Sequence, residues 1–218
     1  MAGLLLADGR LPTGGHAHSA GLEPALRAGL APAEIPRYLR ARLHTVGRVE
    51  AATAVLARRA AVGEITVDLA QLQAAYDART SSAALRAASA QLGRGLSRLA
   101  LRLWPDAPPI GALAAMAAPC RPVALGVVAA VAGLDDIQTA RTALYDDLQT
   151  AACAAPKLIP IDPIEPVRWV LDLGEAVERV GALAVTVTGT ADLPVLTAPL
   201  VEQWSLEHSH RQRRIFHA

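Results

Sequence analysis

The sequence predicts an all-α fold, for reasons of composition, helical periodicity and a lack of strands that could pair. Hydrophobic residues make up 52% of the 218-residue chain and aromatic residues only 3%, so Ala, Leu and Val must fill the interior. These side chains suit closely packed helices better than a β-sandwich, which favours aromatic and β-branched residues. We therefore expect a single domain, residues 1–218, that is a helical bundle of about eight to ten helices.

The first long helix is expected from residue 35 onward. Its inner face is marked by apolar residues at steps of four, four and three, which is helical spacing: Ile35, Leu39, Leu43 and Val46. Its outer face is expected to carry four arginines: Arg37, Arg40, Arg42 and Arg48. A second helix is expected over residues 65–79.

A third helix is expected between Ser81 or Ser82, either of which can cap its N-terminus, and Pro105, which ends it. Its apolar stripe consists of Leu85, Leu92, Leu96, Leu99 and Leu103. Arg94, Arg98 and Arg102 follow one another at i,i+4 on another face, where like charges repel. This stripe is either a solvated basic face or a surface awaiting carboxylates of another helix or subunit.

The remaining chain also fits helices. The most hydrophobic stretch, residues 107–134, is split by Pro119, Arg121 and Pro122, and neither half has the roughly 20 apolar residues that cross a bilayer. We expect two short buried helices there. Residues 165–185 should form a helix whose face is lined by Val167, Val170, Leu171, Val177 and Val180. Residues 182–199 are β-branched but lack a partner strand, so they are interpreted as a helix end and a loop.

Charge and cysteine usage exclude several classes of protein. The net charge of +1 gives no general signal for nucleic acid or an anionic membrane, and it does little to keep copies of the chain apart. Cys120 and Cys153 form no CxxC pair, which argues against a disulfide scaffold or a cysteine zinc module. The N-terminus has no basic region before its short apolar run, so a cytoplasmic protein is expected.

Residues 6–23, LADGRLPTGGHAHSAGLE, are the main candidate site, and three interpretations were compared. A phosphate-binding loop fails because no Lys follows the glycines and no strand is expected before them. A metal site could use His16 and His18, but no third and fourth ligand can be named. In the structural interpretation, Pro12, Gly14 and Gly15 form a turn, Ser19 caps the next helix, and His18 is a packed strut.

No catalytic constellation is visible. There is no GxSxG elbow, no Cys–His pair is suggested by spacing, and the adjacent pairs Asp135–Asp136 and Asp146–Asp147 should point in divergent directions. Without a named nucleophile, base or metal, an enzyme is not expected.

Residues 6–23 resemble the N-terminal signature of the urease accessory protein UreF family. The matching residues are Asp8, Pro12, Thr13, Gly14, His18, Ser19, Gly21, Leu22 and Glu23. Residues 89–100 and 121–134 resemble weaker motifs of the family, and the end of the chain resembles its tail through His208, Arg214, Ile215 and Phe216. Departures include Gly9 in place of the usual Ser, the early Pro24, and Ser209 in place of Glu.

The resemblance implies a non-catalytic, dimerising adaptor that bridges the accessory protein UreD (also called UreH) and the GTPase UreG on apo-urease. GTP hydrolysis in that complex drives nickel insertion, so nickel is cargo and no tightly bound cofactor is expected. Residues 205–218 would form a flexible partner-binding tail, with Phe216 exposed near its end. An alternative is a nickel metallochaperone that binds the ion through His16, His18, His208 and His210.

The expected site residues fall into two groups. Those expected to contact partners are Arg94, Arg98, His208, Arg213, Arg214, Ile215 and Phe216. Those expected to form the structural motif of the N-terminal loop are Asp8, Pro12, Thr13, Gly14, Gly15, His18, Ser19 and Glu23.

Overall fold

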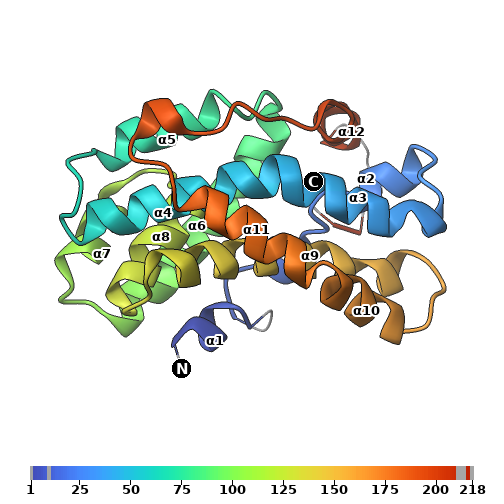
Figure 1. The fold of residues 1–218 in the computed structure, drawn as a ribbon, viewed down its shortest axis with the longest axis horizontal. Coiled ribbons are helices and arrows are strands. Elements are labelled where there is room, and N and C mark those ends of the chain that lie inside the picture. The colour runs from blue at the N-terminus through green and yellow to red at the C-terminus, as the bar shows by residue number, and fades with distance from the viewer. Residues whose placement is uncertain (1, 9–10, 210–214, 217–218) are drawn as a thin grey trace.

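The computed structural model describes residues 2–8, 11–209 and 215–216. Within these ranges the chain is all-α and contains no strand, as predicted (Figure 1). The α-helices are α1 Ala2–Leu6, α2 Leu22–Arg27, α3 Ile35–Arg42, α4 Arg48–Ala61, α5 Leu69–Asp77, α6 Ala83–Leu103, α7 Pro108–Ala115, α8 Arg121–Val131, α9 Asp136–Leu158, α10 Ile164–Asp172, α11 Gly174–Ala184 and α12 Pro199–Ser209. Short 3-10 turns cover Gly15–Ala17, Pro32–Glu34 and Thr190–Asp192. This slightly exceeds the expected number because α1 and α2 are separate short helices and residues 165–185 form two.

Helix α4 lies at the centre of the bundle. It packs against α8, α9 and α11, while α6 packs on the far side of α8. Figure 1 shows α4 running through the middle of the molecule, with α5 and α12 on one side and α8 and α9 on the other. The contact faces are rich in Ala and Val, for example Ala54 and Val55 of α4 and Val123 and Val127 of α8, all fully buried. Small side chains let these helices approach closely, so a core with few aromatic residues can still be dense.

The helix expected from residue 35 continues much further than Val46. Helix α3 passes through a π-helical turn, Leu43–Gly47, directly into α4. Ile35, Leu39 and Leu43 are buried as predicted, but Arg42, which was placed on the outer face, is only 6% exposed. That prediction was wrong because Asp147 of α9 lies opposite Arg42 and neutralises it.

The N-termini of α5 and α6 have side-chain caps. Asp68 accepts a hydrogen bond from the Ala70 amide at 3.2 Å, so α5 is shorter than the predicted 65–79. Ser82, rather than Ser81, caps α6 through the Leu85 amide at 3.3 Å. The leucine stripe of α6 is only partly internal, because Leu96 is buried but Leu103 is 49% exposed.

The two short helices predicted in residues 107–134 are α7 and α8. Helix α8 is largely buried as predicted, but α7 buries only Ile110 and Leu113, so the prediction that both are buried was wrong for α7. No helix among the described residues is long and apolar enough to span a membrane. Residues 165–185 break at Leu173 into α10 and α11, and the expected apolar face is wrong in part, because Val167 and Leu171 are exposed. Trp169 of α10 is buried instead. Residues 185–198 form the predicted loop.

Candidate functional site

The N-terminal loop and the end of the chain meet at one cavity. This cavity has a volume of about 350 Å³ and lies between the loop, α6, α8 and α9. Asp8, Thr13, Gly15 and His18 of the expected structural motif line it, together with Phe216. The expected structural motif near the N-terminus and the expected partner-contacting residue Phe216 therefore share one site.

The loop is a tight turn that is seated directly on α6. Gly14 has a φ of 92°, in the left-handed region, as the turn interpretation requires. A Cβ atom on Gly95 of α6 would lie 2.1 Å from the carbonyl oxygen of Thr13. Only glycine at position 95 allows this backbone contact, so α6 positions the loop without a side chain.

The loop leads into α2 through Ser19, which lies close to the start of the helix, although the N-cap residue is Gly21 and not Ser19 as predicted. The Ser19 Oγ accepts a hydrogen bond from the Glu23 amide at 3.2 Å, which satisfies one of the free amides in the first turn of α2. His18 is 3% exposed, whereas His16 is exposed. His18 is thus packed in the wall between the loop and the core, as the turn interpretation expects.

Glu23 binds the end of the chain. Its side chain is 1% exposed, and its Oε2 accepts hydrogen bonds from the amides of Phe216 at 2.7 Å and Ile215 at 3.1 Å. Arg27 Nε donates to Glu23 Oε1 at 3.0 Å, and His208 Nε2 lies 3.6 Å from Oε2. Burial raises the pKa of Glu23, but the two amides, Arg27 and His208 outweigh it, so the pKa lies below its usual value.

Phe216 is 4% exposed, so the expectation of an exposed Phe216 was wrong. Its ring reaches the cavity, where the Lys157 Nζ lies 5.4 Å from the ring centroid, within range of a cation–π contact. The neighbouring Ile215 is 59% exposed. The hydrogen bond from the Phe216 amide to Glu23 holds this residue against the fold. The composition of the tail did not reveal that contact.

A second buried carboxylate holds α12. Glu202 accepts hydrogen bonds from the Ser81 amide at 3.3 Å and from the Ser82 amide, at the N-terminus of α6. The Oγ atoms of Ser82 and Ser205 are 2.6 Å apart. Residues 205–209, expected to begin a flexible tail, thus lie in α12, with Ser205 and His208 buried. Arg213 and Arg214 lie outside the described residues.

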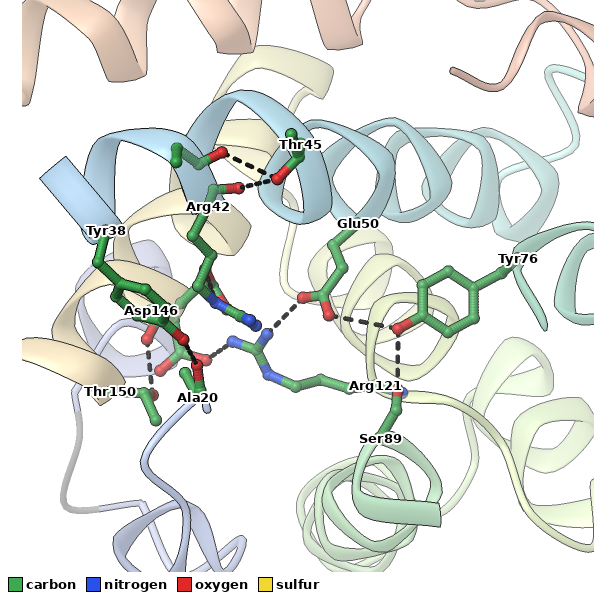
Figure 2. A network of polar contacts seen from close by, with 12 residues as sticks. Ala20, Tyr38, Arg42, Thr45, Glu50, Tyr76, Ser89, Arg121, Asp146 and Thr150 are labelled. Atoms are coloured by element: carbon green, nitrogen blue, oxygen red, sulfur yellow. Dashed lines mark hydrogen bonds and ion pairs between the residues drawn. The ribbon is translucent and has the colours of Figure 1, made fainter. Parts of the chain in front are cut away.

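Beneath the loop lies a network of buried charges (Figure 2). Arg42 donates to Asp147 from Nε at 2.9 Å and from Nη2 at 2.7 Å. Arg121, at the start of α8, donates to Glu50 of α4 at 2.8 Å and to Asp146 of α9. Asp146 and Asp147 therefore bind different arginines, as their expected divergence implies.

Two tyrosines extend the network into its surroundings. Tyr76 donates to Glu50 at 3.3 Å, and its hydroxyl lies 3.4 Å from the Oγ of Ser89. Tyr38 donates to the carbonyl oxygen of Ala20 at 2.6 Å, which ties the loop to α3. Burial raises the pKa of Tyr38 to about 12 and the pKa of Tyr76 well above its usual value. Both phenols therefore stay protonated and can act as hydrogen-bond donors near neutral pH.

Burial also shifts the pKa of two further groups near Tyr76. Burial raises the pKa of Glu50, although Arg121 opposes this effect, and burial raises the pKa of the Cys120 thiol far above its usual range. Each carboxylate faces a guanidinium or a hydroxyl, an arrangement suited to joining α3, α4, α8 and α9.

Sequence reasoning missed Glu50, Tyr76 and the roles of Arg42 and Arg121. One signal was available: Glu50 stands between Val49 and Ala51 in a run of apolar residues, where a charge is costly unless it is paired. The partner, Arg121, follows Cys120 in the other apolar stretch of the chain. Nothing in the spacing shows that these two residues meet.

The remaining predicted residues lie elsewhere. Arg94 and Arg98 are exposed on α6, and no ion pair joins them to another described residue. Of the four histidines in the metal alternative, His18 and His208 are buried, His16 is exposed, and His210 lies outside the described residues. In the described part of the chain, no group of three His, Cys, Asp or Glu residues could hold a metal ion.

Comparison with known proteins gives one consistent result. The family model of UreF matches residues 31–174. A protein of Mycobacterium sp. (strain JLS) is 39% identical over 98% of this chain and 96% of its own length. Proteins of Mycobacterium bovis (strain BCG / Pasteur 1173P2) and Mycolicibacterium vanbaalenii are each 38% identical with the same coverage. All three relatives are named urease accessory protein UreF. The chain belongs to the UreF family of urease accessory proteins.

Proposed function

We propose that the protein is a non-catalytic adaptor in the maturation of urease. It joins UreD (UreH) and the GTPase UreG on apo-urease while GTP-dependent nickel insertion takes place in the cytoplasm. Nickel is the cargo of that complex, and the adaptor itself acts as a homodimer. The single observation that carries the proposal is membership of the UreF family over nearly the whole length of its relatives.

The distribution of charge supports an adaptor. The buried arginines Arg42 and Arg121 are each neutralised by carboxylates of the same chain. Arg94 and Arg98 differ, because both are exposed on one helix and repel each other at i,i+4. Carboxylates from a partner would relieve that repulsion, so this stripe is a natural contact surface.

Charge reversal on α6 tests the proposal. We expect the double variant Arg94→Glu, Arg98→Glu to fold normally, because both side chains are exposed. When co-expressed with UreD, UreG and apo-urease, it should fail to assemble the complex, as measured by size-exclusion chromatography with light scattering. Urease activity in the same cells should fall with the loss of the complex.

The matched control is Arg37→Glu, Arg40→Glu, which reverses two exposed arginines on α3. We expect this control to assemble and to activate urease. If the α6 variant does so equally well, the stripe is only a solvated face. If the unmodified chain joins none of these partners and its absence leaves urease activity unchanged, the adaptor role itself is refuted.

A further inference from the structure

The contacts of Ile215 and Phe216 have the form of a bound peptide on a receptor. Glu23 accepts both of their amides, and His208 Nε2 lies 3.1 Å from the Phe216 carbonyl oxygen. The backbone of Phe216 is therefore bonded on both sides, by two side chains that are each 1% exposed. We propose that Glu23, His208 and the adjoining cavity form a binding site for a bent peptide segment bearing an aromatic residue, occupied in this chain by its own Ile215–Phe216, which lie in a bend.

The carboxylate supplies much of the affinity. Hydrogen bonds to an ionised acceptor are shorter and about twice as strong as neutral ones, and the 2.7 Å bond from the Phe216 amide is of this kind. Because Glu23 is buried, water competes poorly for its oxygens. Backbone amides are common to all peptides, so this part of the site recognises two successive amides that converge on one carboxylate rather than a particular sequence.

The side chains supply selectivity. The Phe216 ring is 4% exposed and lines the cavity beside Lys157, whereas Ile215 is 59% exposed. One side chain therefore points inward and its neighbour outward. An aromatic residue is favoured at the inner position, because a polar residue there would lose both apolar burial and the contact with Lys157. The outer position tolerates many residues.

The helices that carry the receptor side chains have contacts besides those with residues 215–216. Glu23 is in α2, His208 in α12 and Lys157 in α9, and α12 is held separately by Glu202 on the N-terminus of α6. Removal of the Phe216 ring should therefore leave the receptor in place. The altered tail keeps only its backbone bonds to Glu23, so a second peptide that has both the backbone bonds and the Phe ring can displace it.

Amide exchange in the full-length chain provides the first test. We expect the Phe216 amide of the unmodified chain to exchange slowly with solvent, as measured by NMR. In the variant Glu23→Gln the same amide should exchange at least about tenfold faster. The control Glu207→Gln changes an exposed carboxylate one residue from His208 and should leave protection unchanged. Unprotected Phe216 in the unmodified chain, or equal protection in Glu23→Gln, overturns the proposal.

Peptide binding provides the second test and does not depend on how Glu23→Gln folds. The probe is a fluorescein-labelled peptide of residues 211–218, RQRRIFHA, and its binding is measured by fluorescence anisotropy. It should bind the full-length Phe216→Ala chain, and it should bind the unmodified chain at least about tenfold more weakly. The peptide carrying Ala in place of Phe keeps the backbone amides but loses the ring, so it should bind at least about tenfold more weakly than RQRRIFHA. Failure of the first peptide to bind Phe216→Ala overturns the proposal. If protection of the Phe216 amide rises with protein concentration, the segment in the site comes from a second copy of the chain. That result would overturn occupancy by the same chain.

Discussion

Removal of Asp147 should destabilise the protein more than any change to its surface ion pairs. The side chains of Arg42 and Asp147 are only 7% and 4% exposed, and three hydrogen bonds of 2.7–3.1 Å join them. In Asp147→Ala the guanidinium of Arg42 stays buried without its partner. The loss of one partner of a buried pair typically costs 3–5 kcal/mol, so we expect a fall in the free energy of unfolding of about 3–5 kcal/mol.

Burial of the pair does not imply that the pair itself is strongly stabilising. The removal of two charges from water is costly, and their attraction offsets much of that cost rather than exceeding it. The double variant Arg42→Met, Asp147→Leu removes both charges and fills similar space. We expect it to recover most of the stability that Asp147→Ala loses, because no charge remains unpaired.

Urea unfolding of the unmodified chain, Asp147→Ala and the double variant measures these differences in the free energy of unfolding. The control is Glu178→Ala, which breaks the pair with Arg141, whose two side chains are 48% and 52% exposed. An exposed pair contributes about 0–1 kcal/mol. If Asp147→Ala costs no more than Glu178→Ala, or if the double variant is less stable than Asp147→Ala, the buried-network argument is refuted.

Two further predictions concern the loop and the tail. Gly95→Ala should cost about 1–3 kcal/mol in urea unfolding, because the new Cβ would meet the Thr13 carbonyl at 2.1 Å; Gly111→Ala, with open space around it, should be neutral or slightly stabilising. Since folding lowers the pKa of Glu23 below 4.5, its contribution to stability is present above pH 4.5 and is lost as the pH falls through the lowered value. When the free energy of unfolding is measured against pH, it should therefore fall less steeply in acid for Glu23→Gln than for the unmodified chain. An equal slope in the two proteins would contradict the lowered pKa of Glu23.

The fold class could be predicted because helical periodicity and composition act locally. The faces of α3 and the position of α6 follow from the spacing of apolar residues and from a cap at Ser82. The same reasoning failed at Arg42, because an arginine on a helix is assigned outward unless a partner is known. That partner lies 105 positions away, and no periodicity encodes such a distance.

The candidate site was predicted in parts rather than as a whole. Turn chemistry identified the loop with Gly14 and Ser19, and the resemblance identified the end of the chain. Neither indicated that Glu23 would accept the Ile215 amide from 192 positions away. Tail composition suggested disorder, because polar arginines dominate it, but composition carries no information about a receptor elsewhere in the fold.

Burial of Glu23 and order at the end of the chain must therefore be one equilibrium. A carboxylate that is 1% exposed needs donors, and the structure supplies two of them from Ile215 and Phe216. If another protein takes hold of the tail, Glu23 loses those donors and must gain water, a proton or a new partner. Any binding event at Phe216 is thus coupled to the N-terminal loop that Ser19 joins to Glu23, and the coupling has the same magnitude in both directions.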